Sequence, residues 1–294
     1  MTATLTITEP GLVDGMPDDV YHGDPVPSGS LSASGAKKLL PPSCPAKFRY
    51  EQDNPPEPKK TFEFGHAAHR LVLGRGVPIK VIPDDVADSR GGWTTTAAKA
   101  LVAEARENGQ TPLKPEEWDT VQAMAAAIKA HPVASRLFDP ARGKAEQSAF
   151  WVDEASGIWR RARFDFLPHV VEGRRLIIPD YKTAVSAERD KFARAASDYG
   201  YHQQAAWYLD AIKALKGEED AVFVFVVQEK TAPYLVNVIQ LDHNAIAIGD
   251  LLNRRAINTY ARCVAEDHWP GYSDDVQLAQ LPAYYERQFE GDLS

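Results

Sequence analysis

The chain has 294 residues, of which 44% are hydrophobic, enough for one large domain or two modest ones. Its net charge of −8 argues against a protein that coats nucleic acid through bulk positive charge, and its two cysteines, Cys44 and Cys263, cannot supply a four-thiolate zinc or iron–sulfur site. The sequence has no apolar run of about eighteen residues and no secretory signal, so we expect no membrane span, and the few cysteines favour a cytoplasmic protein.

The first part of the chain is expected to be loop and helix. Residues 1–60 are rich in proline, glycine and serine, which predicts a loop-rich segment with short helices near residues 31–40 and 45–52. From residue 61 to residue 138 the apolar residues recur with helical spacing, in segments that end on glycine or open with acidic residues. We therefore expect residues 61–138 to be a helical part.

The rest of the chain changes to a strand-like period. Alternating runs around Ser156 and Gly157 predict a β-hairpin within residues 145–168. The pattern then predicts a buried strand, two helices, two strands and a long helix, which occupy residues 174–184, 188–200, 201–217, 220–230, 233–241 and 243–266. This order indicates an α/β fold with a central mixed sheet flanked by helices. Residues 61–294 would form a single domain, with a sheet core at 145–265 and a C-terminal tail at 266–294.

The strand ending in "DYKTA" carries two charges directly after an apolar run. Side chains alternate along a strand, so Asp180 and Lys182 share one face and Tyr181 points to the other. A carboxylate beside an ammonium suits metal-dependent hydrolysis, because the carboxylate binds a hard divalent cation and the lysine positions or deprotonates water. The alternative is an ordinary surface ion pair, since Asp-x-Lys occurs about once by chance in a chain of this size.

The preceding strand adds a second carboxylate. Arg161, Arg163 and Asp165 lie on one face of it. If this strand pairs antiparallel with the next, Asp165 and Asp180 converge, and a divalent cation between them would offset their repulsion. Arg161 and Arg163 would then point along the same surface and could bind phosphates. The alternative is a solvated hairpin face with mixed charges.

Two helical motifs complete the set of candidates. In "FGHAAHR", Gly65 stands one turn before His69 and would let a facing backbone approach. His69 could be a ligand or a core histidine, and His66 lies three residues before it. In "YHQQAAWY", Gln204 and Tyr208 share a helix face and could hold a strand backbone or a base edge. Amphipathic packing explains such a stripe equally well.

Together these motifs resemble a known family. Their order along the chain is Gly65-x3-His69, Asp165, Asp180-x-Lys182 and Gln204-x3-Tyr208. This order and spacing resemble the PD-(D/E)XK nucleases of the RecB-like type. The resemblance is greatest to phage and prophage proteins similar to the C-terminal nuclease of RecE, also called exodeoxyribonuclease VIII. It covers nearly the whole chain.

The resemblance implies a restriction-endonuclease-like core and a role for each matched residue. His69, Asp165 and Asp180 would be metal ligands, with the carbonyl of Tyr181 as a further oxygen. Lys182 would be the catalytic lysine, acting with Asp165 and Asp180. Gln204 and Tyr208 would lie near the DNA strand and the active site. Glu146 occupies a position where relatives often carry an additional acid.

The function implied is that of a magnesium-dependent exodeoxyribonuclease, with manganese as a substitute and no iron–sulfur cluster. Such an enzyme would degrade linear double-stranded DNA, 5′ to 3′, to leave single-stranded tails for phage recombination. Its partners would be DNA ends, an annealing protein similar to RecT and further copies of itself in a ring. The alternatives are a structure-specific or single-strand nuclease of the same fold, or a non-catalytic DNA-binding or assembly module. Intact His69, Asp165, Asp180 and Lys182 count against the last.

Charge is distributed unevenly along the sequence. Residues 136–194 contain twelve Lys or Arg and nine Asp or Glu, a balance of +3 within a chain of net charge −8. This predicts a cationic groove on an acidic body, which would attract a polyanion to the site without indiscriminate coating. The alternative is charge scattered over exposed faces.

Overall fold

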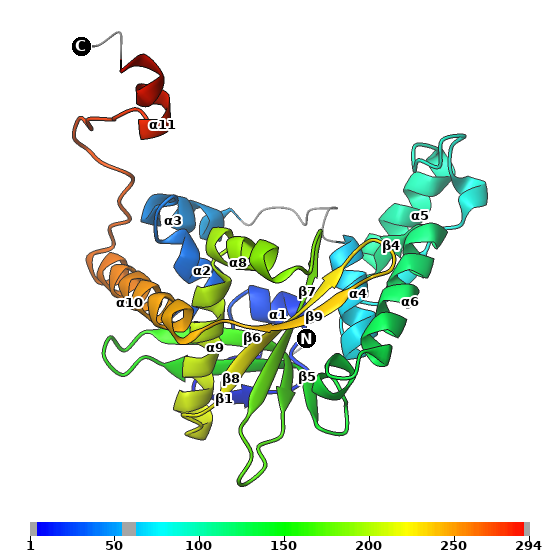
Figure 1. Cartoon of the computed structure of the whole chain (residues 1–294), viewed down its shortest axis with the longest axis horizontal. Helices are drawn as coiled ribbons and strands as arrows, with labels where there is room; N and C mark the ends of the chain where they lie inside the picture. The colour runs from blue at the N-terminus through cyan, green and yellow to red at the C-terminus, as the bar shows by residue number, and fades with distance from the viewer. Residues whose placement is uncertain (1–4, 55–62, 291–294) are drawn as a thin grey trace.

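The computed structural model describes residues 5–54 and 63–290. Its helices are α1 (Asp18–His22), α2 (Ala33–Lys38), α3 (Pro45–Asp53), α4 (Glu63–Leu73), α5 (Thr96–Glu107), α6 (Pro115–Ala130), α7 (Ala134–Leu137), α8 (Arg189–Asp198), α9 (Tyr201–Lys216), α10 (His243–Glu266) and α11 (Ala283–Glu286). Its strands are β1 (Gly11–Val13), β2 (Leu31–Ser32), β3 (Ile79–Val81), β4 (Thr111–Leu113), β5 (Gly143–Val152), β6 (Trp159–Pro168), β7 (Ile177–Ala184), β8 (Val222–Glu229) and β9 (Val236–Gln240). The order from β5 to α10 is the order that the sequence predicts (Figure 1).

The predicted hairpin is β5 and β6, which pair antiparallel over most of their length. Its turn is closed by Asp153, whose Oδ1 accepts hydrogen bonds from the backbone and hydroxyl of Ser156 at 3.0 and 2.7 Å. Short strands from the N-terminal segment extend this sheet on both sides, giving the order β1-β5-β6-β2. The sequence did not predict them, because segments of two or three residues carry no periodic signal.

The second sheet has the order β7-β8-β9, with β7 parallel to β8 and β8 antiparallel to β9. The α/β class with mixed sheets is confirmed. The antiparallel pairing of β6 with β7, which the sequence left open, does not form, because among the described residues β6 and β7 belong to different sheets. The β7 edge that faces away from β8 is therefore left without a backbone ladder in the described structure.

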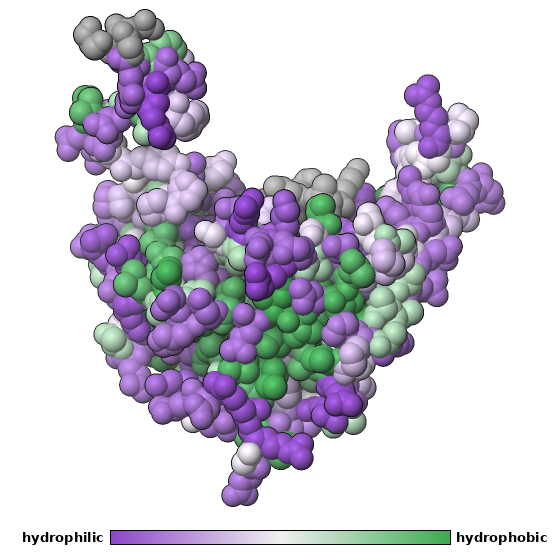
Figure 2. Space-filling model, in the orientation of Figure 1, coloured by the Kyte–Doolittle hydropathy of each residue, from purple (hydrophilic) through white to green (hydrophobic). Residues whose placement is uncertain are grey.

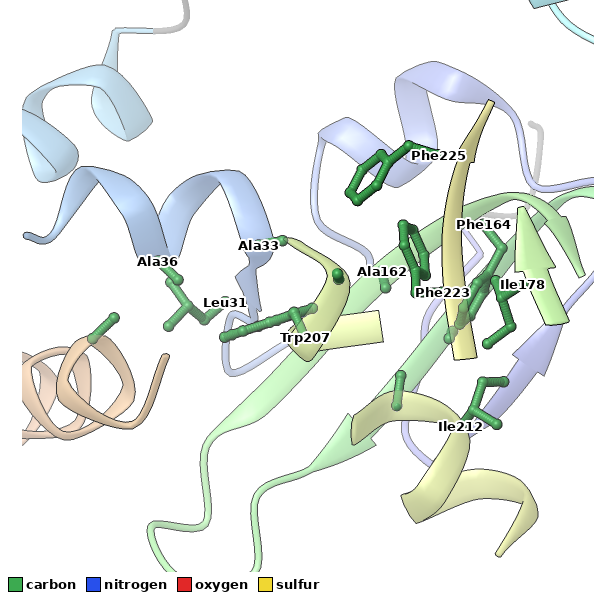
Figure 3. Packing of buried hydrophobic residues seen from close by; sticks show 14 of the residues in the cluster. Leu31, Ala33, Ala36, Ala162, Phe164, Ile178, Trp207, Ile212, Phe223 and Phe225 are labelled. Carbon is green, nitrogen blue, oxygen red and sulfur yellow. The ribbon is translucent and has the colours of Figure 1, made fainter. Parts of the chain in front are cut away.

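Helices hold the two sheets together through a shared hydrophobic core. Trp207 of α9 is fully buried between the β5–β6 hairpin and α2, and its indole nitrogen donates a hydrogen bond to the Arg161 carbonyl at 3.0 Å (Figure 3). Phe164 of β6 and Phe223 of β8 belong to the same cluster, so one core spans both sheets. Truncating Trp207 to alanine would cost about 3–5 kcal/mol of unfolding free energy. The position of α9 over the sheets is thus fixed by packing.

A second core joins the helical part to β7. Ala67 and Ala68 of α4 pack with Met124 of α6 and with Tyr181 of β7, all of them buried. The small alanines allow α4 to lie close to its neighbours, with the side chain of His69 one residue further along. In the described part of the chain, no helix is both long and apolar enough to cross a membrane.

Candidate active site

The centre of the site is the middle of β7. The Asp180 side chain is only 2% exposed, and its Oδ2 lies 2.5 Å from the Lys182 ammonium. Tyr181 points to the other side, where its hydroxyl donates to Oε1 of Gln228 at 2.6 Å. The alternation predicted for this strand therefore holds, and Asp180 and Lys182 form a largely buried ion pair instead of an exposed one.

Asp165 joins this pair from the neighbouring sheet. Its Oδ2 accepts a hydrogen bond from the backbone amide of Tyr181 at 2.8 Å, so a carboxylate satisfies an edge amide that a ladder would otherwise use. Burial raises the pKa of Asp180 to about 6, although the Lys182 ammonium opposes the rise. Burial also raises the pKa of Asp165. Both carboxylates therefore carry an electrostatic cost that a cation would lower.

Helix α9 orients this centre through its Gln-x3-Tyr motif. The Gln204 side-chain amide donates to Oδ1 of Asp180 at 2.7 Å, and the Tyr208 hydroxyl donates to the Arg163 carbonyl at 2.8 Å. The sequence left two polar roles open for this motif, binding a strand backbone or binding a base edge. Tyr208 binds a strand backbone. Gln204 instead fixes a carboxylate of the site. Any contact of these side chains with DNA stays a prediction.

His69 approaches from α4. Its Nδ1 lies 3.7 Å from Oδ2 of Asp165, and its ring meets the Tyr181 ring edge-on with centroids 5.0 Å apart. Burial lowers the pKa of His69 to about 4, and the nearby Lys182 charge adds to the effect. The imidazole is therefore neutral at pH 7, the form that can ligate a metal. Among the described residues, nothing outside the chain neighbours of Gly65 and the backbone of α4 lies within 4 Å of a Cβ built at Gly65, so no facing backbone makes the close approach that this glycine allows.

The donor set fits a hard divalent cation in its chemistry. Two carboxylates, an imidazole and a backbone carbonyl are ligands that Mg²⁺ or Mn²⁺ accepts, and Oδ2 of Asp180 is buried without a well-aligned hydrogen bond. Among the described residues, however, no three His, Cys, Asp or Glu side chains converge into a preformed metal cluster. The Lys182 ammonium lies against Asp180, and the Tyr181 amide binds Asp165, so these two oxygens already have partners.

Glu146 lies beside this centre, at the edge of a cavity. Its neighbours in β5 pair with the neighbours of Asp165 in β6, which places the two acids opposite each other in the hairpin. Its φ of 54° marks a local distortion of β5, and its Oε2 lies 4.0 Å from Nη1 of Arg163. Burial and the charge of Asp165 raise the pKa of Glu146 to about 7. Its role as an additional acid stays a prediction.

Arg161 and Arg163 share a face as predicted, but the N-terminal segment covers it. Arg161 forms an ion pair with Asp24 at 2.6 Å, and Arg163 forms one with Asp18. Their side chains are only 11% and 10% exposed, and both guanidiniums lie over the ring of Tyr21. The expectation of an open phosphate-binding surface is therefore not met, because acids distant in sequence neutralise both charges. Phosphate binding by them would require this segment to move.

Lys37 of α2 is a residue near the site that sequence reasoning missed. Its ammonium donates to the Tyr199 carbonyl at 2.9 Å and lies 5.9 Å from the centre of the Tyr201 ring. The Lys182 ammonium lies 5.4 Å from the centre of the same ring. Burial and, to a smaller extent, the charge of Lys182 together lower the pKa of Lys37 to about 8. No local pattern could reveal this proximity, because the partners are more than 160 positions apart.

Comparison with known proteins identifies the family of this chain. Residues 32–282 match a family described as a PDDEXK-like domain of unknown function (DUF3799). The chain belongs to this family. Asp180 and Lys182 supply an acid-x-lysine sequence within the matched residues. No curated protein matches the chain.

One solved structure shares the fold of this chain. A Eubacterium rectale protein named as a "Putative exonuclease" aligns with a TM-score of 0.54 over 90% of this chain and 94% of that chain, at 12% identity. Identity this low supports a shared fold and nothing more specific. The protein SSO0001 aligns over 71% of this chain and 85% of its own at 13% identity, with a TM-score of 0.29 that is too low to support an inference.

Proposed function

We propose that the protein is a divalent-metal-dependent deoxyribonuclease that degrades linear double-stranded DNA from its ends. The observation that carries the proposal is the contact set at the edge of β7, where Asp165 binds the Tyr181 amide and Asp180 contacts Lys182. These acids are costly to bury, which is typical of residues retained for chemistry rather than for stability. Membership of a PDDEXK-like family supports the same reading.

Each residue of the site has a role in this proposal. Asp165, Asp180, His69 and the Tyr181 carbonyl would hold Mg²⁺ or Mn²⁺. A cation held there would supply activation of water and stabilisation of charge on the phosphate.

The chain's own residues supply the rest. Burial lowers the pKa of Lys182, but attraction to Asp180 and Asp165 outweighs it and raises the pKa overall. Lys182 is therefore an ammonium, suited to stabilising a phosphate oxygen and to positioning water. Gln204 fixes the orientation of Asp180 through its 2.7 Å hydrogen bond.

The proposal extends to the setting of the reaction. Resection would run 5′ to 3′ and leave single-stranded tails, used in phage recombination beside an annealing protein similar to RecT. The enzyme would act as a ring of identical copies. These finer statements rest on the resemblance to RecE-like nucleases, and each is open to test separately.

The test compares linear with covalently closed duplex, labelled at the 5′ or the 3′ end. It is run in magnesium, manganese, calcium or chelator. We expect loss of the 5′ label from linear DNA in magnesium or manganese only, because calcium takes a looser, higher coordination that does not hold an in-line arrangement.

Cleavage of closed or branched DNA would favour the structure-specific alternative, and cleavage of single strands alone would favour the single-strand nuclease. Binding of DNA without cleavage in any of the metals would favour the non-catalytic DNA-binding or assembly module. Each of these results overturns the proposal as stated.

A further inference from the structure

The C-terminal arm (residues 273–290) stands away from the body of the protein (Figures 1 and 2). Just before it, the Tyr272 hydroxyl accepts a hydrogen bond from Lys47 at 2.5 Å, and this contact fixes the root of the arm on α3. Every residue of the arm is exposed. Large apolar side chains are among them, and their exposed fractions are 60% for Leu281, 67% for Tyr284, 44% for Tyr285 and 41% for Phe289.

The arm is also acidic. It contains Asp274, Asp275, Glu286 and Glu290 against the single base Arg287, a net charge of −3. Aromatic side chains exposed to this extent are costly in water, and monomeric proteins rarely gather them on one projecting segment. An acidic segment with aromatic anchors has the composition of a docking peptide for a basic, apolar-floored pocket.

Such a pocket lies at the opposite end of the molecule, between α7 and the connection from β6 to β7. It has a volume of 510 Å³, and Arg136, Arg142, Arg174 and Arg175 line it. Its lining residues, all within the described part of the chain, include no Asp or Glu. Apolar side chains also contribute, among them Val133 and Val171, which are 48% and 50% exposed.

We propose that the C-terminal arm of one copy of this chain docks in the arginine pocket of a second copy. The pocket's arginines complement the arm's carboxylates, Arg136 and Arg174 foremost, since Arg142 pairs with Asp139 at 3.4 Å and Arg175 donates to the Asp220 carbonyl. The apolar lining offers a place for an aromatic ring such as that of Tyr284 or Phe289. A bare phosphate backbone would meet the arginines but leave the apolar lining uncovered. The pocket therefore suits an acidic aromatic peptide better than it suits DNA.

The positions of arm and pocket favour a partner over the chain's own arm. The arm leaves the body at the upper edge of Figure 1, whereas the β6–β7 connection lies at the lower edge. A contact between two different surfaces is heterologous, so it repeats from copy to copy and builds either a closed ring or an open chain. This proposal does not depend on the nuclease activity, because it concerns surfaces outside the catalytic centre.

The experiment measures the mass of the full chain by sedimentation velocity over a wide range of protein concentration. The arm variant is Tyr284→Ser with Phe289→Ser, and the pocket variant is Arg136→Glu with Arg174→Glu. We expect the wild type to assemble and each variant to associate about tenfold more weakly or not at all. Because every substituted position is on the surface, melting temperatures should stay at the wild-type value.

Mixing the two variants gives the sharpest reading. Each pair then has one intact arm and one intact pocket, so we expect a dimer and nothing larger. Tyr50→Ser is the matched control for the arm, since Tyr50 is 67% exposed like Tyr284. Arg189→Glu on α8 is the control for the pocket. Both controls should assemble as the wild type does.

Four results would overturn the proposal. The wild type could remain a monomer at every concentration, or the variants could keep the wild-type mass. A monomer whose arm resists proteolysis would place the arm in its own pocket. A pocket variant that loses DNA affinity with its mass unchanged would assign the pocket to DNA.

Discussion

Two charged clusters, each with one carboxylate from the β5–β6 hairpin, differ in how well their charges are compensated. At the turn, Arg254 binds both oxygens of Asp153 at 2.8 Å, and Arg160 is paired with Asp210. Burial alone would raise the pKa of Asp153, but hydrogen bonds from Arg254 and Ser156 outweigh it and lower the value to about 2. This cluster stabilises the fold.

At the other cluster, acids close to a basic residue show the opposite pKa shift. The Lys182 ammonium acts on both Asp180 and Asp165, yet burial raises the pKa of both acids. A buried carboxylate with a raised pKa costs stability when it is ionised. The comparison indicates that charge alone does not mark a functional site. The distinguishing feature is an acid left incompletely compensated.

The largest effect is expected at Lys182. Lys182→Ala should lower the cleavage rate by about a thousandfold or more while DNA binding changes little, because the ammonium acts on charge that develops during the reaction. Single-turnover cleavage of linear duplex and a separate binding titration measure the two effects. Lys191→Ala on α8 is the control. Cleavage by Lys182→Ala at near the wild-type rate would remove the lysine from the mechanism.

Replacing one carboxylate by an amide in each cluster tests the comparison directly. Asp153→Asn should lower the free energy of unfolding by about 3 kcal/mol, because Arg254 loses its charged partner and Arg160 keeps only Asp210. Asp165→Asn should stay within about 1 kcal/mol of the wild type, because an amide oxygen can still accept the Tyr181 amide and the burial cost disappears. Denaturant unfolding in chelator measures both. Equal losses would contradict the distinction between the clusters.

Acid unfolding sharpens the same point. The folded-state pKa of Asp153 is about 2, below the ordinary value of 3.8, so its stabilisation is complete above pH 4 and lost as the pH falls toward 2. The loss should be about 2 kcal/mol, and the Asp153→Asn variant should not show it. Asp180 has the opposite sign, since its cost grows as the pH rises from 3.8 toward about 6. Unfolding free energies measured in chelator across this range provide the check.

His69 tests the helix-borne donor. His69→Ala should lower activity roughly tenfold to a hundredfold, and raising magnesium or manganese should restore part of it, because a lost ligand weakens metal affinity. His66→Ala, three residues earlier on an exposed face of α4, is the matched control and should remain active. If the two variants behave alike, or activity simply follows melting temperature, His69 is a packing residue.

The smallest effect is expected at Lys37. Lys37→Ala should lower activity by a few-fold, because it removes one partly screened positive charge close to the site where the DNA phosphate would bind. Lys38→Ala is the matched control, since Lys38 follows Lys37 on the same helix but pairs with Glu51 at the surface. This variant should cleave DNA as the wild type does. Steady-state rates on linear duplex measure both variants. Indistinguishable variants would exclude a role for Lys37.

Much of the sheet core could be predicted because its signals are local. The β5–β6 hairpin, β7 and the helices α8 to α10 each carry their own periodicity and turn residues. The partner of a buried charge is different, since nothing near Arg161 in the sequence indicates that Asp24 will neutralise it. Likewise, the predicted local excess of positive charge is not gathered at the site. Arg160, Arg161 and Arg163 are paired with acids, and four other arginines of that stretch line a separate pocket.

The hydrogen bond from the Tyr181 amide to Asp165 links the two sheets at their seam through a side chain instead of a backbone ladder. A ladder would tie β6 to β7 at every second residue, whereas this seam is closed by a group that titrates and can exchange partners. The Tyr181 amide proton is therefore a built-in reporter. Its NMR chemical shift and its rate of exchange with solvent depend on the charge and the contacts of Asp165. Both should therefore change when that carboxylate is protonated, binds a cation or releases the Tyr181 amide.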